Sequence, residues 1–302
     1  MSDDLASLEE IAKAIVDSGA AEIRDVDGGE EPFVYTTGNR GPGYLMIKGL
    51  VGQPETLKYL TKQLAHRVVG SAEFDFHKRV GGAEFDFIEG NATGGMIPGW
   101  QLRNDISDIL GREIPFCYLR GSRKQGGHGE LITGNRNNPL IHKGNKVLIV
   151  EELVNYAETT SNAAVAFREA GYVVSDAACI FSYDHRESNA KLKENNVNLI
   201  SLITLPQFLG AAEERKLFPQ KAIDSYKNFI KDPLEWQLNR WLVIPSGLPD
   251  DGEVEMHTKP KGSVEEALKR GYSMKILGFE EAIERGAPEG KVKEGIVYWA
   301  KE

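Results

Sequence analysis

Two glycine-containing segments of the chain have residue types suited to binding phosphate groups. The first is the turn Asn91–Gly95 (NATGG), which follows an apolar run. Glycines after a parallel strand let backbone N–H groups approach an anion without obstruction by Cβ. The second is the glycine-rich loop 118–130 (YLRGSRKQGGHGE), which can close over a polyanion such as pyrophosphate and exclude water. Taken alone, each also fits an ordinary Gly-Gly turn or a solvated basic loop. The cationic side chains of the loop are Arg120, Arg123, Lys124 and His128.

Carboxylates and a guanidinium follow two further apolar runs. Glu151 and Glu152 come directly after the run 146–150 (KVLIV). Carboxylates at the end of a strand can bind sugar hydroxyls or Mg²⁺, although a solvated strand end is the simpler alternative. Arg186 follows the run 173–181 and can pair with a carboxylate ligand through two hydrogen bonds. We expect its neighbour His185 to be a surface residue rather than a catalyst.

Alternating strands and helices would bring these four segments together. Short apolar runs predict strands, and helices are predicted at 96–110, 158–170 and 187–195, the second of them capped by Thr159 or Glu158. This alternation predicts an α/β fold with a doubly wound parallel sheet and right-handed crossovers. Ligands of such sheets bind at the carboxyl ends of the strands. The predicted strands are 85–89, 114–119, 146–150, 173–181 and 199–203.

The regions before and after this alternation differ from it. Apolar spacing predicts helices at 5–18 and 53–70, separated by a loop or short-strand region. The alternation stops near residue 210, after which a helix is predicted at 211–231. We therefore expect a main domain over 1–210 and a helical or irregular C-terminal appendage over 211–302, which holds three of the four Trp residues.

Composition excludes several classes of protein. The chain has 302 residues, 41% of them hydrophobic and 27% charged, which are globular proportions. The net charge of −9 argues against a general binder of nucleic acid or of anionic membranes. No apolar run is long enough to span a membrane. Cys117 and Cys179 lie in apolar stretches and are expected to be reduced core thiols, which indicates a cytoplasmic protein.

The order of the motifs resembles orotate phosphoribosyltransferase, a type I phosphoribosyltransferase, over about residues 5–210. In chain order they read FVYTTGNRGPGY, IEGNATGG, YLRGSRKQGGHG, VLIVEELV, DHRE and ISLITLPQFL. The resemblance implies transfer of ribose 5-phosphate from phosphoribosyl pyrophosphate to N1 of orotate, with Mg²⁺ and release of pyrophosphate, in pyrimidine nucleotide synthesis. It also implies a homodimer, because the basic loop of the family reaches into the partner subunit's site.

The resemblance also implies a role for each motif. Arg120, Lys124 and His128 would be catalytic residues of the mobile loop that covers pyrophosphate, and Arg123 would bind substrate in the same loop. Glu151 and Glu152 would hold the ribose hydroxyls and, directly or indirectly, the metal. Further substrate-binding residues would be Ala92, Thr93, Gly94 and Gly95 for pyrophosphate, Arg186 for the orotate carboxylate, and Thr37, Gly38 and Tyr44 for the orotate pocket.

The chain departs from the family pattern mainly after its acidic pair. Asn155–Thr159 (NYAET) stands where the family has a Thr-Thr-Gly-Gly-Ser phosphate loop, and Glu158 places a carboxylate near the expected 5′-phosphate. The phosphate site can shift to Thr159, Thr160 and Ser161, which open a helix. Gly121 stands at the position of the family's second loop cation. Thr36 stands where the family has a lysine before the N-terminal motif.

Three functions follow as hypotheses. The first is an orotate phosphoribosyltransferase-like enzyme with an altered phosphate loop. The second is a non-catalytic or regulatory protein of the same fold that binds a nucleotide or nucleobase, which the segment NYAET favours. The third is a phosphoribosyltransferase for another base, because Thr36 and Gly43 alter the expected pocket.

Overall fold

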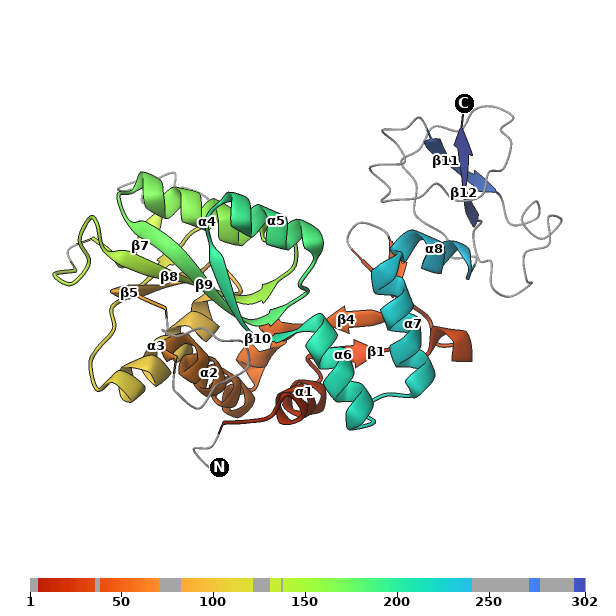
Figure 1. Ribbon diagram of the computed structural model, residues 1–302, viewed down its shortest axis with the longest axis horizontal. Coiled ribbons are helices and arrows are strands. Elements are labelled where there is room, and N and C mark those ends of the chain that lie inside the picture. Colours follow the sequence, from red (N-terminus) through yellow and green to blue (C-terminus); the bar gives the residue numbers. More distant parts are fainter. Residues whose placement is uncertain are drawn as a thin grey trace. The chain divides into compact units, whose positions relative to one another are not determined.

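The chain forms two compact units in the computed structural model (Figure 1). The first comprises Met1–Ala21 and Leu45–Leu217, and the second comprises Glu22–Tyr44 and Phe218–Glu302. The predicted domain ranges, 1–210 and 211–302, stay a prediction. The structure describes residues 5–35, 39–70, 83–121, 131–136, 138–240, 272–277 and 296–301.

The first unit contains a six-stranded sheet with the strand order β10-β9-β8-β5-β6-β7. All neighbours are parallel except β6 and β7, which are antiparallel, so the predicted doubly wound parallel sheet is confirmed. The short strand β7 lies within a segment that the sequence indicates only as a loop. The strands are β5 (Phe87–Asn91), β6 (Phe116–Leu119), β7 (Ile132–Thr133), β8 (Lys146–Val154), β9 (Val173–Ser182) and β10 (Asn198–Thr204).

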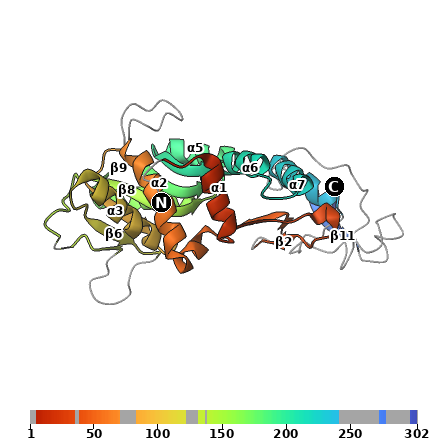
Figure 2. The ribbon, with the colours of Figure 1, turned by 90° about the horizontal axis from the view of Figure 1, so that it is seen from below.

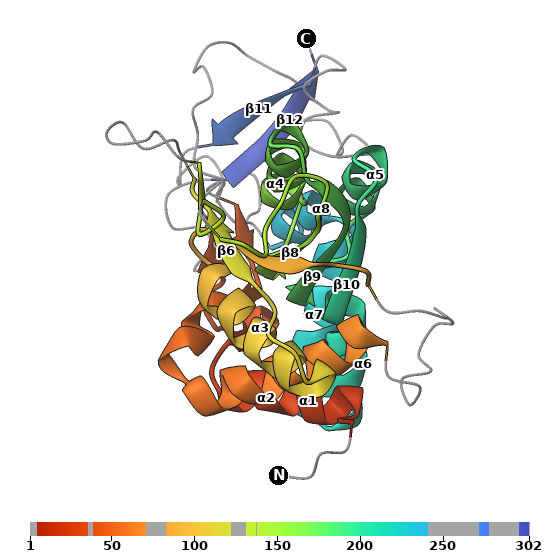
Figure 3. The same ribbon diagram turned by 90° about the vertical axis from the view of Figure 1, so that its left-hand side faces the viewer.

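Helices cover both faces of this sheet (Figures 2 and 3). One face carries α2 (Pro54–Val69) and α3 (Met96–Leu110), which contact each other and the central strands. The other carries α4 (Glu158–Glu169) and α5 (Arg186–Glu194). The remaining elements of this unit are α1 (Leu8–Asp17), the 3₁₀ helix η2 (Ile47–Gly52) and α6 (Leu205–Glu214).

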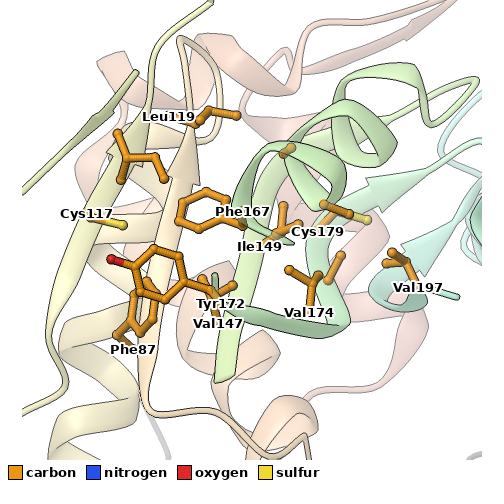
Figure 4. Packing of buried hydrophobic residues seen from close by; sticks show 14 of the residues in the cluster. Phe87, Cys117, Leu119, Val147, Ile149, Phe167, Tyr172, Val174, Cys179 and Val197 are labelled. Carbon is orange, nitrogen blue, oxygen red and sulfur yellow. The ribbon is translucent and has the colours of Figure 1, made fainter. Parts of the chain in front are cut away.

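Buried side chains fix α4 against the sheet (Figure 4). Phe87 of β5 contacts Phe167 of α4 and Tyr172, with ring centroids 6.2 and 5.2 Å away. Cys117 and Cys179 are buried and free, as predicted. Burying a large apolar side chain contributes about 1.5–3 kcal/mol, so this cluster holds the C-terminal half of α4 against the sheet.

Local signals explain where the helices begin and end. Ser7 and Glu10 form a capping box at the start of α1, and Thr204 and Gln207 form another at the start of α6. The predicted continuous helix 211–231 is wrong. The chain leaves α6 after Glu214, passes Lys216 with a φ of 54°, and begins α7 after Pro219.

The second unit combines residues 22–44 with the C-terminal part of the chain. Gly43 lies directly against the Tyr226 ring, where a Cβ would overlap it, and the Arg40 N–H donates to Gln237 Oε1 at 2.8 Å. The antiparallel pair β11–β12 was not predicted. The elements that lie in this unit wholly or in part are β1 (Ala21–Ile23), η1 (Val26–Gly28), β2 (Phe33–Val34), β3 (Arg40–Gly41), β4 (Gly43–Leu45), α7 (Gln220–Lys231), α8 (Pro233–Leu238), β11 (Tyr272–Leu277) and β12 (Ile296–Lys301).

No helix in the described part of the chain combines the length and the apolar character needed to cross a bilayer.

Candidate active site

The glycine turn lies between the carboxyl end of β5 and the start of α3. Every residue of β5 is buried, and the turn leads from Asn91 into α3, whose N-cap is Gly95. A Cβ on Gly95 would overlap the carbonyl oxygen of Val150, and one on Gly94 would overlap the Glu152 carboxylate. Backbone packing against β8 therefore requires glycine at Gly95, whereas at Gly94 the flexible Glu152 side chain would have to move. Ala92 and Gly94 are partly exposed and Thr93 is exposed at the edge of the sheet.

Glu151 lies beside this turn within β8, which continues past the predicted end at 150 to Val154. Its side chain is only 5% exposed. Glu151 Oε1 accepts a hydrogen bond from Asn91 Nδ2 at 2.7 Å and one from Thr160 Oγ1 at 3.4 Å. Burial raises the pKa of Glu151 to about 7, although hydrogen bonds, among them those from Asn91 and Thr160, oppose the rise. One side chain thus links the ends of β5 and β8 to the first turn of α4.

Glu152 points to the other side of the strand and contacts the glycine turn. Its carboxylate lies against Gly94, the first of the two glycines of NATGG. Burial raises the pKa of Glu152, while its backbone hydrogen bonds and the nearby Lys48 ammonium lower it. The two adjacent glutamates therefore reach the turn from opposite faces of β8, because successive strand residues alternate in direction.

Glu89 is a third carboxyl group at this edge, and sequence reasoning missed it. It lies within β5 and is fully buried. Its Oε1 accepts a hydrogen bond from the Leu119 N–H at 3.2 Å, while Oε2 has no partner in the described chain. Burial and the Glu151 charge raise the pKa of Glu89 well above its ordinary value. A charged residue inside the buried run FDFIEG was the signal that could have identified it.

Helix α4 begins at Glu158, one residue after Ala157, which has a φ of 58° and makes no side-chain cap. The predicted cap by Thr159 or Glu158 is therefore wrong. The Glu158 carboxylate forms an ion pair with Lys191 Nζ at 3.1 Å. Thr159 is exposed, whereas Thr160 and Ser161 are buried beneath the helix. The Thr159 side chain hydrogen-bonds to Glu151 and lowers the pKa of that carboxyl group, so the first turn of α4 offers mainly backbone N–H groups to a ligand.

Arg186 is the first residue of α5, at the carboxyl end of β9. It is exposed and forms no ion pair among the residues that the structure describes. His185 precedes it and is half-buried, with a ring stacked on those of Tyr156 and Tyr183. Burial lowers the pKa of His185, while the charges of Glu187 and Asp184 raise it. Arg186 and the two glutamates therefore lie at the carboxyl ends of adjacent strands.

Arg120 lies where β6 ends and the basic loop begins. Its Nε donates to Thr133 Oγ1 at 3.0 Å and its Nη2 to the Tyr118 hydroxyl at 3.3 Å. These contacts fix the guanidinium on the short β6–β7 hairpin. The other predicted loop residues, Arg123, Lys124 and His128, lie outside the described residues.

The predicted base pocket falls mostly outside the described residues. Thr37 and Gly38 belong to the segment that the structure does not describe. Tyr44 lies in β4 of the second unit, where its ring stacks on Phe33 at 5.3 Å. The Arg24 guanidinium lies 3.6 Å from the centre of the same Phe33 ring.

Comparisons with known proteins identify relatives along most of the chain. No family model matches it. A curated orotate phosphoribosyltransferase of Listeria monocytogenes is 28% identical over 209 residues, which are 68% of this chain and 88% of the relative. The chain is a homologue of the orotate phosphoribosyltransferases.

Solved structures show that the homology extends to the fold. The orotate phosphoribosyltransferase of Francisella tularensis matches with a TM-score of 0.54 at 12% identity, covering 74% of this chain and 98% of that one. UMP synthase of Leishmania donovani matches with a TM-score of 0.55 at 20% identity, covering 75% of this chain and 42% of that one. The fold is that of the type I phosphoribosyltransferases.

Glu151 and Glu152 are the residues that the sequence predicts for the metal. Within the described ranges, no three His, Cys, Asp or Glu side chains gather as metal ligands do. Glu151 already accepts hydrogen bonds, and its raised pKa leaves it partly protonated near neutral pH. Glu151 and Glu152 are therefore suited to accept hydrogen bonds from hydroxyl groups of a ligand. They could also contact the water shell of a metal ion that binds together with that ligand.

Proposed function

We propose that the protein transfers ribose 5-phosphate from phosphoribosyl pyrophosphate to N1 of orotate. The single observation that supports this most strongly is the hydrogen bond from Asn91 to Glu151. It joins the glycine turn after β5 to the acidic pair in β8, the two groups expected to bind the diphosphate and the ribose of one donor molecule. Homology to orotate phosphoribosyltransferases supports the reaction class.

In the proposed reaction, orotate N1 loses its proton and bonds to C1 of the ribose as the bond from C1 to the pyrophosphate oxygen breaks, and the pyrophosphate leaves with that electron pair and can take up the proton. The backbone of Ala92–Gly95 binds the departing pyrophosphate, and Arg120 and Lys124 neutralise its charge, assisted by His128 and Arg123. Stabilisation of a leaving anion by preorganised donors is worth several kcal/mol at such sites. Glu151 and Glu152 orient the ribose hydroxyls, and Arg186 binds the orotate carboxylate.

Mg²⁺ enters this proposal as part of the substrate. The donor set of Glu151 and Glu152 fits an ion whose main ligands are the oxygen atoms of the donor itself. Bound there, the ion would offset diphosphate charge. The 5′-phosphate is assigned to the first turn of α4, where Thr159 and Thr160 supply backbone N–H groups, whereas the Ser161 N–H donates to the Ala157 carbonyl oxygen at 3.0 Å. Of these residues only Thr159 also has an exposed side chain.

A spectrophotometric assay of orotate consumption with phosphoribosyl pyrophosphate and Mg²⁺ tests the proposal. We expect turnover by the unmodified protein and a large loss in Lys124→Ala, with Lys193→Ala as a matched control on α5. No turnover above the Lys124→Ala background would contradict the proposal.

A second candidate function is a non-catalytic protein of this fold that binds a nucleotide or nucleobase. The ion pair between Glu158 and Lys191 at the start of α4 favours it, because a carboxylate stands where a phosphate is expected. Calorimetric titration separates the two functions. Binding of orotate or a nucleotide without binding of phosphoribosyl pyrophosphate supports the second candidate.

The remaining features of the proposal have separate tests. A panel of nucleobases tests whether another base replaces orotate, although Gly43 is explained by its packing against Tyr226. The homodimer predicts a dimeric species in sedimentation at micromolar concentration, and a monomer alone would oppose it. The two free thiols support a cytoplasmic location, which fractionation of cells tests.

A further inference from the structure

Three aromatic rings form a continuous column at the carboxyl ends of β8 and β9. The Tyr156 ring stacks on His185 with centroids 5.2 Å apart and planes 20° apart. The His185 ring stacks on Tyr183 in the same way, at 5.3 Å and 17°. Tyr156 follows β8, and Tyr183 and His185 follow β9, the adjacent parallel strand. These distances are those of favourable aromatic pairs.

The middle ring of this column is held in place. His185 Nε2 lies 3.0 Å from Asn155 Oδ1, so the two loops are linked by a hydrogen bond beside the stack. The His185 carbonyl oxygen accepts a hydrogen bond from Ser188 Oγ at 2.8 Å, which anchors the residue to α5. Tyr156 is itself followed by the buried Ala157. The column is therefore preorganised, which lowers the entropy lost when a ligand binds.

The outer end of the column is open to solvent. Tyr156 is 55% exposed, although its ring packs against His185. A polar group lies beside this exposed ring: the amide of the neighbouring Asn155, whose Nδ2 has no partner within the described residues. An apolar ring surface with hydrogen-bonding groups beside it matches a nucleobase, which has a flat face and a polar edge.

We infer that the exposed face of Tyr156 is a binding site for the planar heteroaromatic ring of a nucleoside or nucleotide. The ring extends the column Tyr183–His185–Tyr156, and Asn155 contacts its edge. Glu158 does not repel this ligand as it would a phosphate, because a nucleobase is uncharged and Lys191 pairs with the carboxylate. The site does not depend on phosphoribosyl transfer.

Adenosine and uridine are suitable probes, because they present a ring without phosphate. Saturation-transfer NMR and calorimetry with the full chain would measure their binding. Loss of a base–aromatic stack should weaken adenosine binding to Tyr156→Ala by about fivefold to 150-fold. Tyr156→Phe, which keeps the ring, should bind within about twofold of the unmodified protein. Val165→Ala, an exposed substitution elsewhere on α4, is the matched control.

Ribose 5-phosphate separates this inference from the proposed function. It carries a phosphate and no base, so its binding should be the same in Tyr156→Ala and in the unmodified protein. Adenosine binding lost in Tyr156→Ala supports the stacking site whether or not orotate is turned over. Equal adenosine binding in Tyr156→Ala and the unmodified protein, or no binding of either nucleoside to the unmodified protein, would overturn the inference.

Discussion

Substitution of Glu151 by Gln should remove a pH dependence of stability that originates at the candidate site. The folded protein holds the pKa of Glu151 at about 7, against an ordinary value of 4.5. Between these values the folded state binds more protons than the unfolded state, so the free energy of unfolding falls as pH rises. A difference of about 2.5 pKa units corresponds to about 3 kcal/mol, lost progressively as pH rises through the folded pKa.

Glutamine has nearly the same shape and can still accept the hydrogen bonds from Asn91 and Thr160, but it does not titrate. We therefore expect Glu151→Gln to gain about 2.5 kcal/mol relative to the unmodified protein between about pH 5 and about pH 8. The other titratable groups close to Glu151, namely Glu89, Glu152 and Cys179, are present in both proteins. The Glu151 charge raises the pKa of Glu89 and of Cys179, so the comparison measures Glu151 together with its effect on these two groups.

Hydrogen exchange of peptides from β8 measures this difference within the first unit alone. The ratio of exchange rates between the two proteins at one pH removes the intrinsic pH dependence of exchange. That ratio should change roughly 70-fold between about pH 5 and about pH 8, with slower exchange in Glu151→Gln at the higher pH. A ratio that does not change with pH would refute the argument that burial controls the Glu151 proton.

The remaining predictions concern the turn, the start of α4 and the buried carboxyl group. Gly95→Ala should lower the free energy of unfolding by about 1–3 kcal/mol, because the new Cβ would overlap the Val150 carbonyl oxygen. Thermal denaturation measures this loss. An unchanged midpoint would contradict the close packing of Gly95 against β8. Glu158→Gln should leave stability within about 1 kcal/mol, since its ion pair with Lys191 is exposed, yet tighten binding of phosphoribosyl pyrophosphate in calorimetry. Equal or weaker donor binding would show that the phosphate does not approach this carboxylate. Glu89→Gln should stabilise the protein at alkaline pH, where the buried Glu89 carboxyl group would otherwise ionise. Urea denaturation near pH 9 tests this. An equal free energy of unfolding in the two proteins would contradict the raised pKa of Glu89.

Much of the fold could be predicted because its strands and helices carry strong local patterns. The helix predicted at 96–110 matches α3, and the run KVLIV correctly indicated a buried strand. The strand β8 nevertheless extends four residues further, through Glu151 and Glu152. Pairing with β9 as far as Val154 and Ser182 overrides the low strand propensity of glutamate.

Features that depend on contacts between distant segments could not be read from the sequence. The two-residue strand β7 exists only because Tyr118 and Leu119 pair with it. The aromatic column joins Tyr156 to two residues that follow the next strand, a relation that no local pattern contains. The break between α6 and α7 was missed although Pro219 marks it, because apolar residues continue on both sides.

The most direct test of the central claim is a crystal structure of the protein soaked with phosphoribosyl pyrophosphate and Mg²⁺. We predict that the diphosphate lies on the backbone of Ala92–Gly95, with the ribose hydroxyls at Glu151 and Glu152 and the 5′-phosphate at the first turn of α4. A donor molecule bound elsewhere on the chain, or none bound at a saturating concentration, would contradict the claim that the carboxyl ends of β5 and β8 form one sugar-diphosphate site.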